Sequence, residues 1–248
     1  MKIILSIRNF KRVISGKSRT TFMKIFIKII TIYCLAMNVL QAQTEPSKIF
    51  EQSFVSNNQV FGFSVSPDGN HLYFVNSYGG RKKLQIMESE KKKGKWSTPK
   101  PAFFSNQTYR EIDPFISPDG NTILYNTRRS TKENTSDDKD LDIWMLQRKN
   151  GKWSKPFPLD AINTEEHETY ATMAQNGNIY FGVNKKGGYG NGDIYVSRLE
   201  NGVYQIPQNI GFPVNTDKDE GNCFIAPDES FMIFSANGFT SNFGGFDL

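Results

Sequence analysis

Short runs of aromatic and β-branched residues recur along the chain, and each pair of runs flanks a polar turn of the type Ser-Pro-Asp-Gly. In such a turn Pro presets the first central position, Asp tolerates the second, and Gly relieves the exit. Runs of this length and composition are typical of β-strands. The sequence therefore predicts strands at residues 61–65, 112–116, 169–173 and 221–225 before the turns, and at 72–74, 123–125, 179–181 and 231–234 after them.

The turn is repeated four times. Its copies begin at Ser66, Ser117, Ala174 and Ala226, at successive offsets of 51, 57 and 52 residues. Periods of this size indicate a propeller or another stacked array. A third strand is predicted in each of the first three repeats, and an aromatic residue follows eleven residues after the first residue of its motif: Trp96 after Gln85, Trp153 after Asp142, and Tyr204 after Asp193.

The aromatic residue follows a turn that contains Gly, which predicts a hairpin between the third strand and an outer strand. A proline then follows, at Pro99, Pro156 or Pro207. Because proline cannot donate to a β-ladder, we expect it to end the outer strand or to lie at the edge. Four strands in each period correspond to one propeller blade.

These motifs resemble the repeat of PD40 or TolB-type β-propellers, which combines the Ser-Pro-Asp-Gly turn, an aromatic strand, a Gly-Gly loop and Asp-Ile-Trp. The sequence departs from the repeat at Gln85, at Gln175-Asn176 and at Glu229, which replaces the Gly of the turn. The resemblance implies an all-β propeller of four-stranded blades. About four repeats are present, the last incomplete, so we expect a truncated copy of a six-bladed propeller. TolB-like propellers serve as docking platforms for envelope proteins.

The pattern divides the chain into three parts. Residues 1–42 form an N-terminal extension and signal peptide, in which either Met1 or Met23 is the start, and residues 43–59 form a linker with enough apolar residues to supply a closing strand. Residues 60–248 form the blades, at about 60–104, 109–162, 168–214 and 220–248.

The extension carries Lys24 and Lys28 before an apolar run at 29–37, which is typical of a secretory signal peptide. The alternative is a membrane anchor, but the run is short for crossing a bilayer. We therefore expect a mature chain without a membrane span, located in the periplasm or cell envelope. Cys223 would be its one cysteine, so no intramolecular disulfide forms there, and we expect a buried thiol.

The net charge of +5 does not indicate nucleic-acid binding. Eight basic residues and no acidic residue lie in residues 1–42, which leaves 22 basic against 25 acidic residues, a net charge of −3, for the rest. The folded part therefore gives no electrostatic reason to expect a nucleic-acid partner.

A second repeated pattern lies upstream of the turns, where an Asn is followed five residues later by a Glu at the entrance of the innermost strand. Successive blades would then present a ring of carboxylates at one end of the channel, able to bind cationic peptide groups, a metal ion or sugar hydroxyls. The alternative is that each Glu accepts hydrogen bonds from its own loop. The candidate ligand-binding residues at this channel entrance are Glu111, Asp113, Glu168, Tyr170, Glu220 and Asn222.

The remaining polar residues favour structural roles. Asp142, Asp193 and Asp247 precede strands, where caps are a better interpretation than metal ligands. The acid-rich segment 130–140 is interpreted as a solvated loop, with calcium as the lesser alternative. His71 and His167 lie in no metal-binding spacing and near no nucleophile motif, so catalysis finds little support and no cofactor or metal is predicted.

The sequence thus predicts an exported, non-enzymatic propeller that acts as a protein-binding or assembly module, with an envelope protein or peptide as its partner. Two alternatives stay open. One is a propeller that binds glycans, for which exposed aromatic residues such as Tyr109 or Tyr170 are required. The other is the non-catalytic propeller portion of a hydrolase or lyase.

Overall fold

The computed structural model describes residues 50, 55, 59–106, 108–129, 140–184, 187–240 and 244–248. The signal peptide, most of the linker and the acid-rich segment at 130–139 lie outside these residues, so what the sequence predicts for them stays a prediction. Every regular element in the described residues is a β-strand, and none of them contains a helix long and apolar enough to cross a membrane.

The first blade is an antiparallel sheet in the order β1-β2-β3, with two short strands that both pair with β3. It begins at the turn-flanking strands that the sequence predicts. Its strands are β1 (Val60–Val65), β2 (His71–Tyr78), β3 (Lys83–Lys92), β4 (Lys95–Trp96) and β5 (Lys100–Pro101).

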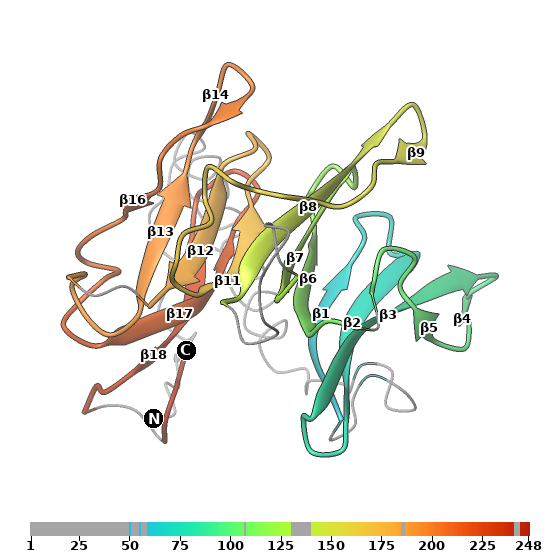
Figure 1. The fold of residues 1–248 in the computed structure, drawn as a ribbon, viewed down its shortest axis with the longest axis horizontal. Helices are drawn as coiled ribbons and strands as arrows, with labels where there is room; N and C mark the ends of the chain where they lie inside the picture. The colour runs from blue at the N-terminus through green and yellow to red at the C-terminus, as the bar shows by residue number, and fades with distance from the viewer. Residues whose placement is uncertain are drawn as a thin grey trace, which may run out of the picture. The chain divides into compact units, whose positions relative to one another are not determined.

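The second blade repeats this arrangement, and its sheet lies beside the first because β6 contacts β1 (Figure 1). The chain runs outward from β6 to β8 and then forms two short strands that again pair with one long strand. These strands are β6 (Glu111–Ile116), β7 (Thr122–Thr127), β8 (Asp142–Lys149), β9 (Lys152–Trp153) and β10 (Phe157–Pro158).

The third blade has the order β11-β12-β13-β16 with a separate hairpin β14-β15, and the fourth sheet contains β17 and β18. An isolated bridge between Ala236 and Asp247 adds to the fourth sheet. The strands are β11 (Glu168–Met173), β12 (Ile179–Val183), β13 (Asp193–Ser197), β14 (Leu199–Glu200), β15 (Val203–Tyr204), β16 (Gln208–Asn209), β17 (Asp219–Ile225) and β18 (Met232–Asn237).

The outer strand lies at the sheet edge, which is one of the two predicted alternatives, and proline interrupts this strand and does not end it. In the first two blades the chain pairs with the long strand before the proline, leaves it, and pairs again further along. Pro99 lies between β4 and β5, and Pro156 lies between β9 and β10. The physical reason is that proline removes one donor, which breaks the ladder locally while the following residues remain free to pair.

Each innermost strand contains a β-bulge at the same repeated position. The pairing register shifts there in β1, β6, β11 and β17. A bulge redirects one side chain relative to the strand alternation. The residue in left-handed backbone conformation is Gly62 (φ 52°), Asp113 (φ 53°), Tyr170 (φ 52°) or Asn222 (φ 49°).

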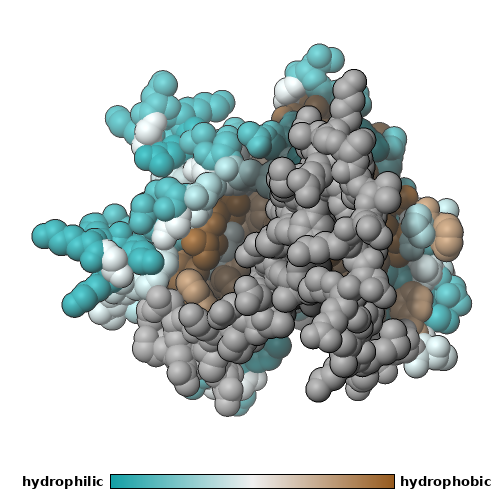
Figure 2. Space-filling view, turned by 180° about the vertical axis from the view of Figure 1, so that it is seen from behind, coloured by the Kyte–Doolittle hydropathy of each residue, from teal (hydrophilic) through white to brown (hydrophobic). Residues whose placement is uncertain are grey.

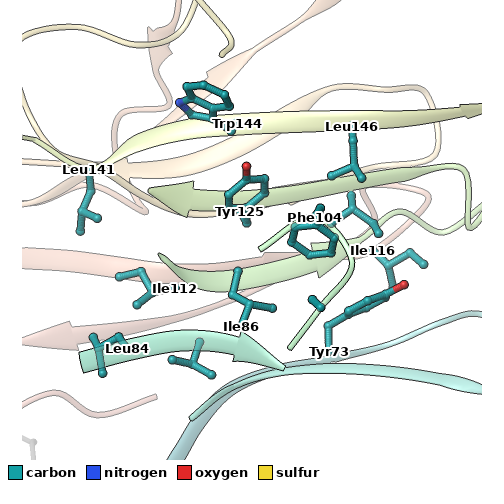
Figure 3. Close-up of a cluster of buried hydrophobic side chains, with 13 residues drawn as sticks. Tyr73, Leu84, Ile86, Phe104, Ile112, Ile116, Tyr125, Leu141, Trp144 and Leu146 are labelled. Atoms are coloured by element: carbon teal, nitrogen blue, oxygen red, sulfur yellow. The ribbon is translucent and has the colours of Figure 1, made fainter. Parts of the chain in front are cut away.

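The core lies between the blades, so every inner blade is covered on two faces. Residues of β2 and β3 pack against residues of β6, β7 and β8, with Tyr125 and Ile123 fully buried among them (Figure 3). Leu124, on the opposite face of β7, packs instead toward β11 and β12. Successive strand side chains point to opposite faces, which explains how one strand serves two cores.

Hydrophobic side chains also reach the surface of the described part, where they gather between hydrophilic ones (Figure 2). Cys223 is 2% exposed, which confirms its predicted burial. The fourth sheet is less enclosed than the others: Phe224, Phe231 and Ile233 all expose more than a third of their surface.

Candidate functional site

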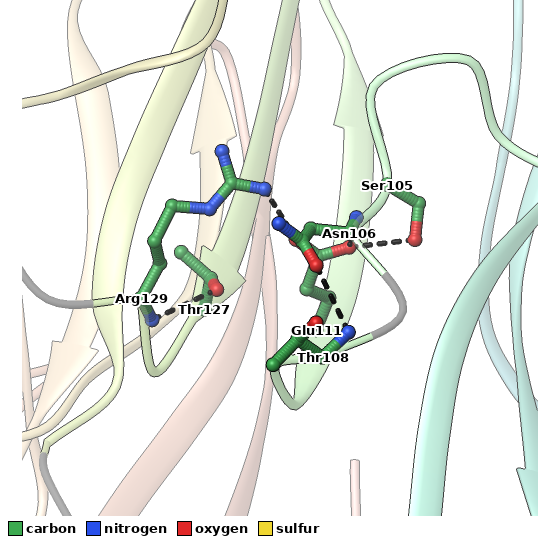
Figure 4. Close-up of polar contacts among 6 residues, drawn as sticks. All are labelled: Ser105, Asn106, Thr108, Glu111, Thr127 and Arg129. Carbon is green, nitrogen blue, oxygen red and sulfur yellow. Dashed lines mark hydrogen bonds and ion pairs between the residues drawn. The ribbon is translucent and has the colours of Figure 1, made fainter. Parts of the chain in front are cut away.

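The repeated glutamates begin the innermost strands and are buried there. Glu111 is fully buried, and its carboxylate accepts hydrogen bonds from Ser105 Oγ at 2.6 Å and from the Asn106 backbone N–H at 2.9 Å. Arg129 Nη2 lies 2.9 Å from the other carboxylate oxygen and forms an ion pair with it (Figure 4). Burial raises the pKa of Glu111, although these hydrogen bonds and the guanidinium act in the opposite direction.

The other two glutamates bind their own loops in the same manner. Thr164 Oγ1 donates to Glu168 Oε1 at 2.6 Å, and Thr216 donates to Glu220 through both its hydroxyl and its backbone N–H. Burial raises the pKa of Glu168 to about 7, and its Oε2 atom has no partner among the described residues. All three carboxylates thus hold the loop that leads into their strand, and a role in ligand binding stays a prediction for them.

Asp113 lies two residues after Glu111 and differs from the glutamates in having no partner. It is 6% exposed, and neither carboxylate oxygen has a hydrogen-bond partner among the described residues. Burial raises its pKa to about 7, while Arg81 and Arg110 lower it from a distance. A buried carboxylate without donors is costly to ionise, so this group would gain from any donor that reached it.

The bulges of the first two blades face each other. A Cβ atom built on Gly62 would lie 3.2 Å from Asp113 Oδ1, so the absence of a side chain in the first blade leaves room for this carboxylate. Asp113 also raises the pKa of Tyr170, the bulge residue of the third blade, after the larger effect of burial. Asp113 thus interacts electrostatically with Tyr170, Arg81 and Arg110.

Asn126 joins the second and third blades next to this group. Its Oδ1 accepts the Tyr170 backbone N–H at 3.1 Å, and its Nδ2 donates to the Glu168 carbonyl at 2.6 Å. Asn222, the candidate from the fourth blade, is bound within its own sheet, where Nδ2 donates to Ser235 Oγ at 2.9 Å. Sequence reasoning missed Arg81, Arg110 and Asn126, because none of them belongs to the repeated pattern.

The aspartate before β13 has a structural role, as the sequence predicts. The Asp193 carboxylate accepts the backbone N–H groups of Tyr189 at 2.7 Å and Gly190 at 3.2 Å, together with Asn209 Nδ2 at 3.0 Å. His167 also acts structurally, since its Nδ1 accepts the Leu141 N–H at 3.0 Å. No group of three His, Cys, Asp or Glu side chains is placed to hold a metal ion within the described residues.

The repeated antiparallel blades, each with its bulged inner strand and with cores between neighbouring sheets, define an all-β propeller. The prediction of an all-β propeller is confirmed at the level of the fold. The sequence matches no protein-family model and no curated protein.

Several solved structures are similar to the chain. TolB from Acinetobacter baumannii has 14% identity and a TM-score of 0.45 over 75% of this chain and 43% of that one. The putative TolB from Agrobacterium tumefaciens has 14% identity and a TM-score of 0.44 over 63% and 50%. The tricorn protease has 16% identity and a TM-score of 0.44 over 81% and 21%. The chain spans half or less of the length of each of these structures.

Proposed function

We propose that this propeller is exported and acts without catalysis as a protein-binding or assembly module of the cell envelope. The observation that carries the proposal is the bulge repeated in every innermost strand, which sets one side chain per blade apart from the strand alternation. A bulge of this kind often re-aims a side chain at a functional site. Export is supported by the basic and apolar pattern of residues 24–42.

Asp113 gives the proposed site its chemistry. Its two unpartnered oxygens can accept the backbone N–H or ammonium groups of a peptide, and Arg81 and Arg110 nearby supply donors for carbonyl or carboxylate groups. Tyr170 adds an aromatic ring to the same group. An extended segment of an envelope protein, which alternates donors and acceptors, would satisfy these residues together.

The test is a pull-down from envelope extracts with the tagged full chain and with its Asp113→Asn variant. The amide keeps the size of the side chain and suits left-handed backbone, but it removes the charge. Because hydrogen bonds to charged groups contribute roughly 1.5–3 kcal/mol, we expect the captured protein to bind at least about tenfold more weakly to the variant. The protein recovered from the periplasm is expected to begin near Gln43.

The matched control is Asp68→Asn, since Asp68 lies in an exposed turn and accepts bonds from its own Ser66 and Asn70. This variant is expected to capture the same protein as the parent. Equal capture by the parent and Asp113→Asn would contradict the proposed site, and capture of a glycan with no protein would favour the glycan alternative.

A further inference from the structure

A polar groove with aromatic walls lies between the first and second blades, on the side of the Ser-Pro-Asp-Gly turns. It consists of two neighbouring hollows of about 220 Å³ and 480 Å³, and His71, Tyr73 and Trp153 line both of them. The turn residues 119–121 of the second blade border one hollow, and Glu88 of β3 borders the other. None of these residues belongs to the site proposed above, so either site can fail without the other.

The Tyr73 hydroxyl faces this groove without a partner. The ring is 4% exposed and packs against Phe104 at a centroid distance of 5.7 Å, while the hydroxyl lies at the margin of the cluster (Figure 3). This hydroxyl forms no hydrogen bond within the described residues. Burial raises the pKa of Tyr73, Glu88 raises it further, and Arg148 lowers it, which places both charges near the ring.

The same position is closed between the third and fourth blades. Tyr180 occupies the same position in the strand pairing of the third blade as Tyr73 does in the first. The Tyr180 hydroxyl donates to Glu229 Oε1 at 2.8 Å. Asn176 and Asn178 donate to the same carboxylate at 2.9 Å and 2.8 Å. The Glu229 carboxylate thus supplies an acceptor for the Tyr180 hydroxyl across the two blades.

Gly120 stands in the second blade where Glu229 stands in the fourth, and this difference opens the groove. A Cβ atom on Gly120 would meet Pro67 Cδ at 3.6 Å, which is ordinary contact, so packing does not require glycine there. Both positions have left-handed backbone, with φ of 72° at Gly120 and 59° at Glu229. The first inter-blade space therefore lacks the carboxylate that the last one has.

The carboxylates that border the groove already have partners. Glu88 forms an ion pair with Lys100 at 3.1 Å, and Glu90 forms one with Lys92 at 2.8 Å. Asp119 accepts hydrogen bonds from its own turn. A cationic ligand would find little unpaired carboxylate there, whereas a hydroxyl group can donate to and accept from His71 and Tyr73 and can accept from the Arg148 guanidinium.

Aromatic rings supply the apolar part of the lining. Trp153 lies against Phe103 at a centroid distance of 6.0 Å, and the Arg148 guanidinium lies 6.0 Å from the Trp153 ring. β3 is paired with β2 on one side and with β4 and β5 on the other, so an added peptide strand could pair only with the outer edge of β4 or β5. We propose that the groove binds a neutral saccharide, whose hydroxyls reach Tyr73 and His71 while its apolar face lies on Trp153.

The test is titration of the full chain with three neutral trisaccharides: maltotriose, cellotriose and chitotriose. Binding is measured by tryptophan fluorescence and saturation-transfer NMR. We expect saturable binding of at least one of them. Gly120→Glu should abolish binding, because the new carboxylate would meet Tyr73 as Glu229 meets Tyr180. Tyr73→Phe removes a hydroxyl that has no protein partner, so it should weaken binding roughly 2- to 10-fold with an unchanged thermal midpoint.

Tyr180→Phe is the matched control, because it removes the equivalent hydroxyl where the space is closed, and it should leave saccharide binding unchanged. If Gly120→Glu does not fold, the comparison of saccharide binding by Tyr73→Phe and Tyr180→Phe is the test. The proposal is overturned if no trisaccharide binds, if Tyr73→Phe binds as the parent does, or if the tripeptide Ala-Trp-Ala binds while the saccharides do not.

Discussion

A different residue occupies the left-handed position of the bulge in each innermost strand. The surroundings of each residue determine whether its side chain finds hydrogen-bond partners. Asn222 satisfies its amide inside its own sheet, whereas Asp113 has a buried carboxylate with no donor. A non-glycine residue in this conformation costs about 1 kcal/mol or more. Strain and an unpartnered carboxyl group therefore coincide at Asp113, which is why we propose it as a binding residue.

We expect Asp113→Asn to change how stability depends on pH. The folded pKa of Asp113 is about 7 against an ordinary value of 3.8, so the unfolded chain releases this proton first. Below about pH 4 Asp113 is protonated in both states and does not lower the free energy of unfolding of the parent. As the pH rises toward 7, the unfolded chain ionises first and the parent loses stability. The amide cannot ionise, so the variant should unfold at a similar temperature at pH 4 and at a higher one at pH 8.

The expected gain at pH 8 is on the order of 4 kcal/mol, since the pKa differs by about 3 units and each unit corresponds to about 1.4 kcal/mol. Thermal unfolding from pH 4 to pH 8 measures it. The pKa of Glu168 is also raised to about 7, so the stability of both the parent and the variant should still fall somewhat as the pH rises. Parallel curves for parent and variant would show that Asp113 is not the desolvated group described here.

At the scale of elements, asparagine side chains fasten the third strand of a blade to the loop that leaves it. Asn163 accepts the Ile143 backbone N–H at 2.9 Å and donates to the Ile143 carbonyl at 3.0 Å. Asn215 does the same with Ile194, at 2.8 Å and 2.7 Å. This explains why Asn recurs five residues before the Glu of the innermost strand in two of the three repeats.

We expect Asn163→Ala to destabilise the protein. The Ile143 carbonyl would keep its bond from the Leu159 N–H at 3.1 Å, but the Ile143 N–H would lose its acceptor. A buried donor left unsatisfied costs roughly 1–3 kcal/mol, which lowers the thermal midpoint by several degrees. Asn106→Ala is the control, because Asn106 Oδ1 accepts only the N–H of exposed Thr108, and its loss should change the midpoint little. Equal losses in the two variants would refute this role.

The elements that the sequence predicts are those governed by local rules. The turn chemistry at Ser117 and the alternation around Tyr125 are encoded within a few residues, so strands and blade period could be predicted. The interrupted outer strand could not, because proline limits a ladder without determining where pairing resumes. Asn126 and Glu229 act across blades, and their partners lie at least 42 residues away in the sequence, so only the folded chain reveals them.

At the scale of the described molecule, stability depends on the spaces between neighbouring blades. The first core cluster joins the first and second blades, and the second joins the second and third. The second blade thus contributes to both, and every residue of β7 is buried. In arrays of this kind, stability is approximately a sum over units and their nearest-neighbour contacts.

We therefore expect amide hydrogen exchange to be slowest in β7 and fastest in β18, where side chains such as Ile233 are about half exposed. Leu124→Ala should create a cavity on the third-blade side of β7 and cost about 2–5 kcal/mol. It should speed exchange in β7 and β12 more than in β2, because the first core does not contain Leu124. Exchange mass spectrometry of the parent and the variant measures both effects. Uniform acceleration in all blades would show that the sheets unfold as one cooperative unit, and protection of β18 equal to that of β7 would show that the fourth sheet is covered in solution.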